Sequence, residues 1–257
     1  KAARIILICM SSRSNFEIFG LVIHGFDFKE IDQRIREAAK QTRPFWIVTA
    51  NPEILLTARK NPAYWQILRQ ADVRIVDGFG LQLMGWLCGA RPKRQSGADL
   101  AFEILRRAEK ENWQVALVGG AEGVAEKAAR EIRKKFSKLK ICAADGGQID
   151  AQGVGDAEAS QTLKKLLEQK PEVIFVAFGH PKQEAWIARH IQDFSNLQII
   201  LGVGGTFDFW AGRIKRAPKF MRRVGLEWLW RLIVEPKRWR RILNAVIIFP
   251  LTVLRNK

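Results

Sequence analysis

Apolar and polar positions alternate along this chain in blocks that predict strands and helices in turn. Short, continuous apolar runs that end at glycine or a polar residue predict strands, and apolar residues spaced three and four apart predict helices. Strands are predicted at 16–24 (a strand or hairpin), 45–49, 73–76, 114–118, 139–143, 173–178 and 198–201. Helices are predicted at 29–40, after the Asn51-Pro52 N-cap, at 79–88, from Ser96 or Asp99 to about 111, and at 121–136, 157–169 and 182–193.

Strands that are apolar throughout and that alternate with helices indicate a mostly parallel sheet covered by helices on both faces. The fold class predicted is therefore α/β. In open sheets of this class, the ligand binds beyond the carboxyl ends of the strands. We expect the residues at these ends to line one pocket; they are Thr49, Asp77, Gly119, Asp145, Gly179 and Gly202.

The length of 257 residues fits one ordinary domain with an appendage. The net charge of +17 is uneven, because residues 213–257 hold 13 Lys and Arg against two Asp and Glu. We predict a catalytic core at 1–212 and a basic, Trp-rich, membrane-associating appendage at 213–257. A cationic segment of this kind attracts nucleic acid, anionic lipid or a phosphorylated ligand.

Cysteine usage and hydropathy indicate a cytosolic protein. Cys9, Cys88 and Cys142 are odd in number and lack metal-type spacing, which indicates reduced thiols. The segment Lys1–Met10 is too short for a signal peptide and predicts a first strand. No run approaches the ~20 apolar residues of a membrane span. The apolar run Ile242–Leu254 is short enough to lie in the membrane interface instead.

Polar residues follow two of the predicted strands directly. Asp77, which precedes Gly78, is either a carboxylate that takes a proton from an incoming hydroxyl or a turn residue that caps the next helix. Thr49 and Asn51 are able to hydrogen-bond a sugar or a phosphate, although a plain N-cap role for Asn51 is the interpretation that the sequence favours. The residues alone leave both alternatives open.

Two glycine-rich turns bear on the ligand. Gly119-Gly120 before a helix suits a diphosphate, but glycine is also common there for packing. The stretch Gly202–Phe207 lacks the third glycine of a dinucleotide fingerprint, and we expect no good helix after it, which disfavours nicotinamide and flavin cofactors. We expect no cofactor and no metal, because the chain has no His/Cys cluster and no Asp-x-Asp pair. Arginines would then have to stabilise a departing diphosphate.

A polar segment, His180–Glu184, opens a predicted helix. Gln183 and Glu184 in its first turn are either capping residues or groups at the mouth of the pocket. For His180 the sequence favours a structural role.

The basic tail predicts two helical segments between Leu226 and Arg241, separated at Pro236. Arg231, Arg238 and Arg241 recur there among tryptophans. This pattern fits a solvated basic face, a nucleic-acid patch or a lipid interface. The apolar run that follows favours lipid, because such a run does not suit a water-exposed nucleic-acid groove.

These motifs, in this order between residues 16 and 241, resemble the WecG/TagA/CpsF glycosyltransferase family (glycosyltransferase family 26). The matching segments are Thr49–Glu53, Ala71–Gly78, Arg94–Leu100, Leu117–Gly120, Asp145-Gly146, Phe178–Glu184, Gly202–Gly212, Arg216–Pro218 and Leu226–Arg238. Their order and spacing make the resemblance far more specific than any single motif.

The resemblance implies a Rossmann-like fold with a C-terminal appendage that completes the site and touches the membrane. It also implies sugar transfer, with inversion, from a UDP donor to a lipid-diphosphate-linked sugar. Asp77 would be the general base on the acceptor hydroxyl. The implied substrate-binding residues are Thr49, Asn51, Arg94, Gly120, Gln183, Gly205 and Asp208, and the implied diphosphate-binding residues are Arg231, Arg238 and Arg241.

The leading hypothesis is an inverting, metal-independent hexosyltransferase of bacterial cell-surface polysaccharide synthesis. Its partners would be a UDP-sugar (of the N-acetylmannosamine type, its uronate, or glucose), a polyprenyl-diphosphate-linked acceptor and the inner face of the cell membrane. We expect no nucleic-acid partner, and a homo-oligomer remains open. The alternative is a non-enzymatic basic module that binds anionic lipid or nucleic acid.

Overall fold

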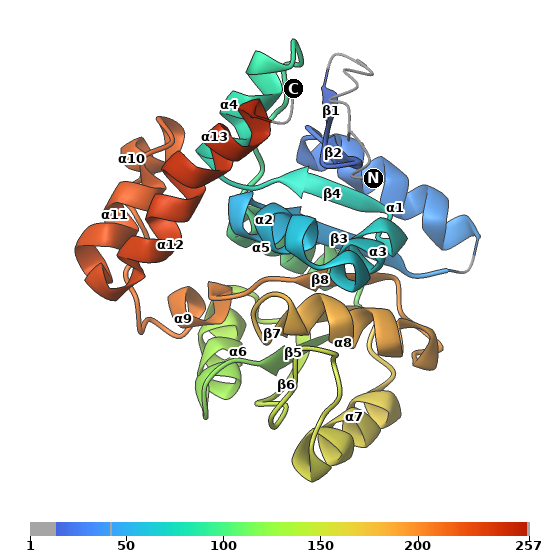
Figure 1. Cartoon of the computed structure of the whole chain (residues 1–257). Helices are drawn as coiled ribbons and strands as arrows, with labels where there is room; N and C mark the ends of the chain where they lie inside the picture. The colour runs from blue at the N-terminus through green and yellow to red at the C-terminus, as the bar shows by residue number, and fades with distance from the viewer. Residues whose placement is uncertain (1–13, 42, 256–257) are drawn as a thin grey trace.

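The computed structural model describes residues 14–41 and 43–255, except for the side chains of Arg223 and Arg238 (Figure 1). The strand predicted at Lys1–Met10, and Cys9 within it, lie outside the described residues. The strands are β1 (Asn15–Ile18), β2 (Leu21–His24), β3 (Phe45–Ala50), β4 (Val73–Val76), β5 (Gln114–Gly119), β6 (Lys140–Ala144), β7 (Val173–Ala177) and β8 (Ile199–Gly202).

Helices connect these strands and continue beyond the last one. Those of the first 212 residues are α1 (Phe28–Lys40), α2 (Pro52–Lys60), α3 (Pro62–Gln70), α4 (Phe79–Leu87), α5 (Gly97–Lys110), α6 (Val124–Lys135), α7 (Ala157–Gln169), α8 (Lys182–His190) with the 3-10 turn η1 (Ile191–Asp193), and α9 (Thr206–Trp210). The tail holds α10 (Lys219–Arg223), α11 (Glu227–Val234), the 3-10 turn η2 (Pro236–Arg238), α12 (Trp239–Leu243), the π-helical turn η3 (Asn244–Ile248) and α13 (Phe249–Leu254).

The described strands form one eight-stranded sheet in the order β1-β2-β4-β3-β8-β7-β5-β6. The hairpin of β1 and β2 is antiparallel, and every other neighbouring pair is parallel. The prediction of an α/β, mostly parallel, Rossmann-like sheet is confirmed. Because the central strands run the same way, β4, β3, β8, β7 and β5 bring their carboxyl ends to one edge of the sheet.

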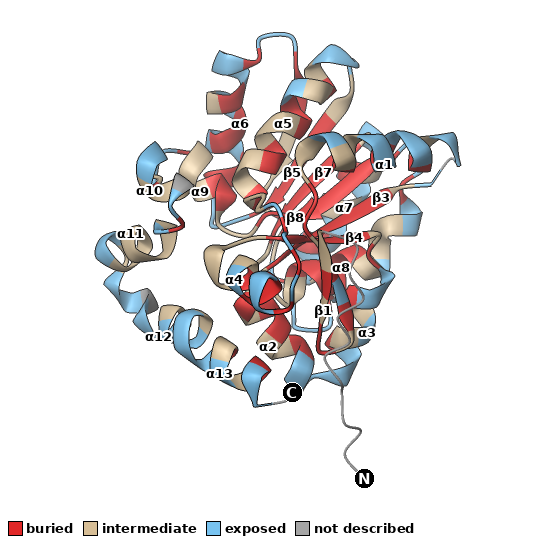
Figure 2. Ribbon diagram, turned by 90° about the horizontal axis from the view of Figure 1, so that it is seen from above, coloured by how far each residue is buried: buried red, intermediate tan, exposed pale blue. Residues whose placement is uncertain are grey.

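Helices cover both faces of the sheet, as predicted, and the strands between them are buried (Figure 2). One hydrophobic cluster joins the sheet to α1, α5, α6 and α9. The other joins it to α2, α3, α4, α7 and α8, and it also includes Phe249 and Val253 of α13. The tail is therefore anchored in the same core as the helices of the sheet.

The helices that follow two of the glycine-rich turns differ from the prediction. A short helix, α9, does follow the glycine-rich turn at 202–205, because Thr206 and Phe207 turn inward and are buried against the sheet. Helix α6 begins at Val124 rather than at 121, because Gly123 adopts a left-handed conformation with φ of 70°. The described cysteines, Cys88 and Cys142, are free thiols.

Among the described residues, none of the helices has both the length and the apolar character that crossing a bilayer requires. The tail helices instead wrap around one side of the molecule, next to α4 and α2 (Figure 1). The ring of Phe249 lies fully buried, with its centroid 6.4 Å from that of Phe19 in an edge-to-face arrangement.

This anchoring predicts an unequal effect of two substitutions in α13. Phe249→Ala should lower the free energy of unfolding by about 3–5 kcal/mol, because it leaves a cavity in the core. Leu251 is 48% exposed, so Leu251→Ala should change the free energy of unfolding by no more than about 0.5 kcal/mol. Urea denaturation measures both, and equal effects would contradict the anchoring role of Phe249.

Candidate functional site

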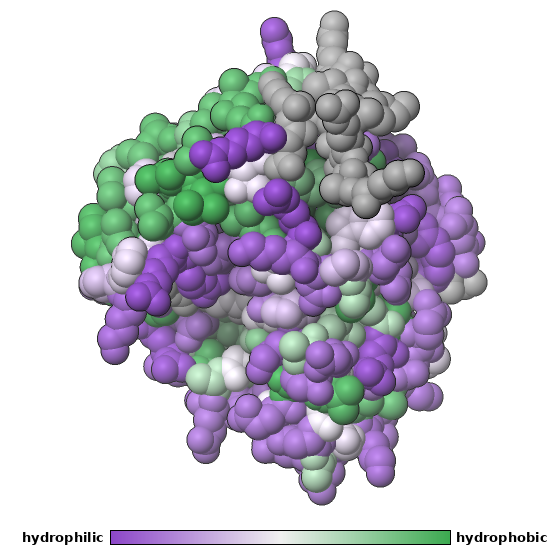
Figure 3. All heavy atoms as spheres, viewed as in Figure 1, coloured by the Kyte–Doolittle hydropathy of each residue, from purple (hydrophilic) through white to green (hydrophobic). Residues whose placement is uncertain are grey.

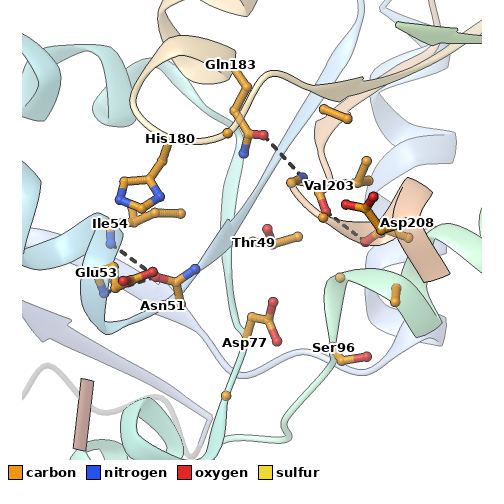
Figure 4. A pocket seen from close by; sticks show the side chains of 18 of the residues that line it. Thr49, Asn51, Glu53, Ile54, Asp77, Ser96, His180, Gln183, Val203 and Asp208 are labelled. Atoms are coloured by element: carbon orange, nitrogen blue, oxygen red, sulfur yellow. Dashed lines mark hydrogen bonds between the residues drawn. The ribbon is translucent and has the colours of Figure 1, made fainter. Parts of the chain in front are cut away.

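A cavity of about 610 Å³ opens at the carboxyl edge of the sheet, and the tail closes one side of it. Its walls come from the segments that follow β3, β4, β6, β7 and β8, from Gly120 after β5, and from the start of α5. Helices α11 and α12 add Glu227, Trp228, Arg231 and Arg241. Figure 4 shows the polar side chains that converge on this space from different strands.

Asp77 lies at the end of β4, and its carboxylate points into the cavity (Figure 4). Its backbone N–H donates to the carbonyl of Ala50 at 2.8 Å, which fixes the strand end beside β3. Burial and, to a smaller extent, the nearby Glu227 raise the pKa of Asp77 to about 6, against the opposing effect of Arg231. Such a carboxylate is ionised at neutral pH and accepts a proton more readily than an ordinary aspartate does.

Thr49 and Asn51, at the end of β3, serve the fold and face the cavity at the same time. The side-chain oxygen of Asn51 accepts from the N–H groups of Glu53 and Ile54 at 3.0 and 3.1 Å, so it is the predicted N-cap of α2. Its amide nitrogen is left on the cavity side (Figure 4). The Thr49 hydroxyl donates to the carbonyl of Gly202 at 3.2 Å, which leaves the lone pairs of its oxygen available to a ligand.

Gln183 holds the glycine-rich turn after β8 in place. Its side-chain oxygen accepts from the N–H of Gly204 at 3.2 Å. Its side chain also packs so closely on Gly202 that a Cβ atom at this glycine would lie 2.4 Å from Nε2 of Gln183. Gln183 lines the cavity, but its side-chain oxygen and nitrogen are both used in hydrogen bonds within the protein.

Gln183 belongs to a buried polar chain behind the cavity. Its Nε2 donates to Glu184 at 2.7 Å, and the hydroxyl of Tyr64 donates to the other carboxylate oxygen at 2.9 Å. Glu184 is only 1% exposed, and burial raises its pKa to about 7. Neither Gln183 nor Glu184 caps α8, so the capping interpretation of this motif is wrong: both side chains turn into the core.

Only part of the predicted set of strand-end residues lines the cavity. Thr49, Asp77 and Gly179 do; Gly119, Asp145 and Gly202 do not. Gly119 and Gly202 pack against Phe178 and Gln183 respectively, with no room for a Cβ atom. The carboxylate of Asp145 instead accepts from the N–H of Gly123 at 2.7 Å. Residues one or two positions further on take their places; they are Gly120, Gly147 and Val203.

The remaining predicted substrate-binding residues, Gly120, Gly205, Asp208 and Arg94, all line the cavity. The N–H of Gly120 donates to the carbonyl of Ala177 at 3.1 Å, so this glycine offers close backbone approach but not a free donor. The carboxylate of Asp208 lies 3.6 Å from the guanidinium of Arg213.

The predicted diphosphate-binding arginines have different surroundings. Arg231 lines the cavity, with its guanidinium carbon 4.9 Å from the ring centroid of Phe209. Arg241 also lines it but donates two hydrogen bonds, of 2.7 and 2.6 Å, to the carboxylate of Glu53. The side chain of Arg238 lies outside the described part of the structure. The roles of all three remain predictions.

An ion-pair cluster that the sequence analysis did not anticipate joins the tail to the core. Arg216 grips Asp99 with two hydrogen bonds of 2.7 and 2.8 Å and donates a third to Ser96. Arg222 adds a bond to Asp99 at 3.2 Å, and its carbonyl accepts from Arg94. These partners are more than 100 residues apart in sequence, so no local spacing predicts the pairing. Asp99 and Arg216 do lie within two of the family motifs, Arg94–Leu100 and Arg216–Pro218.

Two acidic residues at the cavity were also missed as site candidates. Glu227 lies 3.7 Å from Nε of Arg216 and faces the same space as Asp77. Glu53 pairs with Arg241, and His180 lies nearby (Figure 4). Burial lowers the pKa of His180, Glu53 acts to raise it and Arg241 acts to lower it. Both glutamates occur within quoted motifs, but only their position after folding shows that they belong to the site.

The described residues contain no group of three or more His, Cys, Asp and Glu side chains that is arranged to hold a metal ion. What the cavity does present is one carboxylate with a raised pKa, surrounded by hydroxyl, amide and guanidinium groups. This set can deprotonate a hydroxyl and bind an anionic leaving group in the same enclosure.

Comparisons with known proteins identify the family that this sequence matches. The family model described as "Glycosyl transferase WecG/TagA/CpsF family" matches residues 16–257. An N-acetylglucosaminyldiphosphoundecaprenol N-acetyl-beta-D-mannosaminyltransferase of Bacillus spizizenii is 35% identical over 207 residues, which cover 79% of this chain and 77% of that protein. The protein of the same name from Staphylococcus aureus strain MRSA252 is 29% identical over 252 residues, covering 96% and 95%.

The buried Glu184 predicts a pH-dependent stability. Because its pKa in the folded state lies near 7, above the usual value of 4.5, the folded state holds a proton that the unfolded state releases between these pH values. The stability of the native protein relative to Glu184→Gln should therefore fall as the pH rises from 4.5 to 7, by up to about 3 kcal/mol. Urea denaturation of both proteins across this range measures the difference. A difference that is independent of pH would contradict the buried, proton-binding state of Glu184.

Proposed function

The chain belongs to the WecG/TagA/CpsF family of glycosyl transferases, and from this premise we propose a specific reaction. The enzyme transfers a hexosyl group from a UDP-sugar to a sugar carried on a polyprenyl diphosphate, with inversion and without a metal ion. The single observation that carries the proposal is the carboxylate of Asp77, which faces a cavity that tail arginines help to line.

In the proposed reaction, the carboxylate of Asp77 accepts the proton of the acceptor hydroxyl. The oxygen then forms a bond to the anomeric carbon of the donor from the face opposite UDP, and the bond between that carbon and the UDP oxygen breaks. One base and no covalent nucleophile satisfy this displacement. The proton ends on Asp77, whose raised pKa makes it a stronger base than an ordinary aspartate.

The departing UDP leaves with additional negative charge, which needs nearby cations. Arg231 and Arg94 line the cavity and lower the pKa of Asp77, which supports the proposal that their charges act on the departing UDP. Arginine binds phosphate through two parallel hydrogen bonds. Arg241 is a third cation in the cavity wall, and it would release the carboxylate of Glu53 and bind a phosphate group in its place.

The relatives support a choice of substrates. Their names specify N-acetylglucosaminyldiphosphoundecaprenol as the acceptor and N-acetyl-beta-D-mannosamine as the transferred sugar. We propose the same acceptor class and an N-acetylmannosamine-type donor here, on the inner face of the cell membrane. The alternative of a non-enzymatic basic module assigns no role to the cavity or to the strand-end carboxylate.

The decisive variant is Asp77→Asn, which keeps the shape of the side chain and removes the base. Transfer should fall by a factor of about 100 to 10,000 while UDP affinity stays near that of the native enzyme. In the native enzyme, transfer should rise with pH through about 6, as Asp77 loses its proton. An assay with a radiolabelled UDP-sugar and a short-chain acceptor measures transfer, and calorimetry measures UDP binding.

A matched control for this variant is Glu168→Gln, which changes an exposed carboxylate of α7 outside the cavity. It should leave transfer unchanged. Undiminished transfer by Asp77→Asn would refute the assigned role.

Asp77→Asn should also unfold at a higher temperature than the native protein at pH 8, because the carboxylate of Asp77 is costly to ionise in the folded state. Thermal denaturation of both proteins measures this difference.

The contact between Glu53 and Arg241 predicts a gain in anion affinity. Glu53→Gln should strengthen UDP binding by about two- to fivefold, because an exposed ion pair of this kind is worth up to about 1 kcal/mol. Glu103→Gln, which loses a comparable exposed pair with Arg106 on α5, serves as the control and should not alter UDP binding. Unchanged or weaker UDP binding by Glu53→Gln would show that Glu53 does not compete with phosphate for Arg241.

A further inference from the structure

Helix α4 of the core exposes an apolar face. Its residues Leu81, Met84 and Gly85 are buried on the inner side, whereas Leu83, Trp86 and Leu87 are 36%, 46% and 52% exposed. The exposed side chains are spaced three and four apart and thus lie on one side of the helix. The segment Phe79–Leu87 carries no charged residue. Large apolar side chains are therefore exposed to solvent on the core as well as on the tail.

The tail exposes a second apolar face. In α13, Phe249 and Val253 turn into the core, whereas Leu251 and Leu254 are exposed. The exposed apolar side chains of the tail are Phe220, Val224, Leu226, Ile233, Val234, Trp239, Leu243, Val246, Ile247, Ile248, Leu251 and Leu254. The tail thus carries one anchored side and one apolar, solvent-facing side.

The two apolar faces are continuous. Figure 3 shows hydrophobic side chains gathered over the side of the molecule where α4, α13 and the other tail helices lie in Figure 1. The backbones meet closely there: a Cβ atom at Gly80 would lie 3.3 Å from the carbonyl oxygen of Ala245, and one at Gly225 would clash with Phe79. Helix α4 and the tail are therefore packed against each other and form one surface.

The charges around this surface match an anionic partner. In the described part of the tail, exposed cations outside the cavity accompany the apolar side chains; they are Arg213, Lys215, Lys219, Lys237, Arg240 and Arg255. The acidic residues of the tail, Glu227 and Glu235, are both partly buried. Apolar side chains bordered by Lys and Arg, with Trp among them, suit the interface of an anionic bilayer.

We propose that α4 of the core and the tail helices α10–α13 form a single docking surface for an anionic lipid bilayer. This inference rests on the proposed function, which places the acceptor in a membrane, and adds a core element to the contact. Helix α4 begins two residues after Asp77. Docking through α4 therefore holds the catalytic strand end, as well as the tail, at a fixed depth relative to the lipid.

The test uses the full chain and sedimentation with vesicles of phosphatidylcholine containing phosphatidylglycerol. The double variant Leu83→Glu/Leu87→Glu should weaken partitioning by roughly tenfold or more, because two apolar contacts become anionic. Neither residue lines the cavity, so UDP affinity should be unchanged. The matched control is Val154→Glu, an apolar side chain that is 46% exposed in the turn between β6 and α7. Its partitioning should be close to that of the native protein, lowered only by the repulsion between one added negative charge and the anionic vesicles.

A second measurement needs no substitution. Hydrogen exchange of the native protein should slow in the α4 peptide when these vesicles are added, and it should not slow around Val154. Partitioning of the double variant equal to that of Val154→Glu, or unchanged exchange in α4, would overturn the proposal and leave the tail as the contact. A loss of self-association in the double variant without lipid would overturn it too, since α4 would then face a second copy of the chain. Neither measurement requires transfer activity, so a failed proposal about the reaction is distinguished from this one.

Discussion

The bidentate ion pair between Arg216 and Asp99 holds the tail against the core, and the shape of the cavity depends on this constraint. Asp99 lies in the first turn of α5, and Arg216 lies near the start of the tail. Although burial raises the pKa of Asp99, the hydrogen bonds from Arg216 and Ser96 lower it overall, so this carboxylate is well stabilised as an anion. Arg222 and Arg94 extend the cluster, which orients α11 so that Glu227 and Arg231 face Asp77.

The site and the fold compete for the same residues. Asp77 and Glu184 are carboxylates whose ionisation burial disfavours, and each therefore costs the folded state stability near neutral pH. Glu184 is held by Tyr64 and Gln183 and shapes the turn at Gly204, whereas Asp77 faces the cavity. An apolar residue would stabilise the fold more at either position, but it would remove a proton acceptor or a support of the cavity wall.

The sequence pattern was sufficient for the sheet, because apolar strands that end in glycine or polar residues leave few other architectures. It also placed Asp77, Thr49 and Asn51 at strand ends, and these three meet in the cavity. It failed for Gly119 and Gly202, since a glycine at a strand end serves close packing as readily as ligand approach. It could not find the pairs of Arg216 with Asp99 or Arg241 with Glu53, because a charge on a helix does not specify a partner far away in the chain. Whether the cavity residues have the catalytic and binding roles assigned to them stays a prediction.

The hydroxyl that supports Glu184 belongs to Tyr64, and the chain contains a single tyrosine. Burial and, after it, the neighbouring Glu184 carboxylate raise the pKa of this phenol well above its usual range. In a protein labelled at its tyrosine ring, all ring resonances therefore come from this one residue of the polar chain behind the cavity, without any substitution. The environment of the ring changes when Glu184 gains or loses a proton, so these resonances report the protonation state of the polar chain that holds the glycine-rich turn.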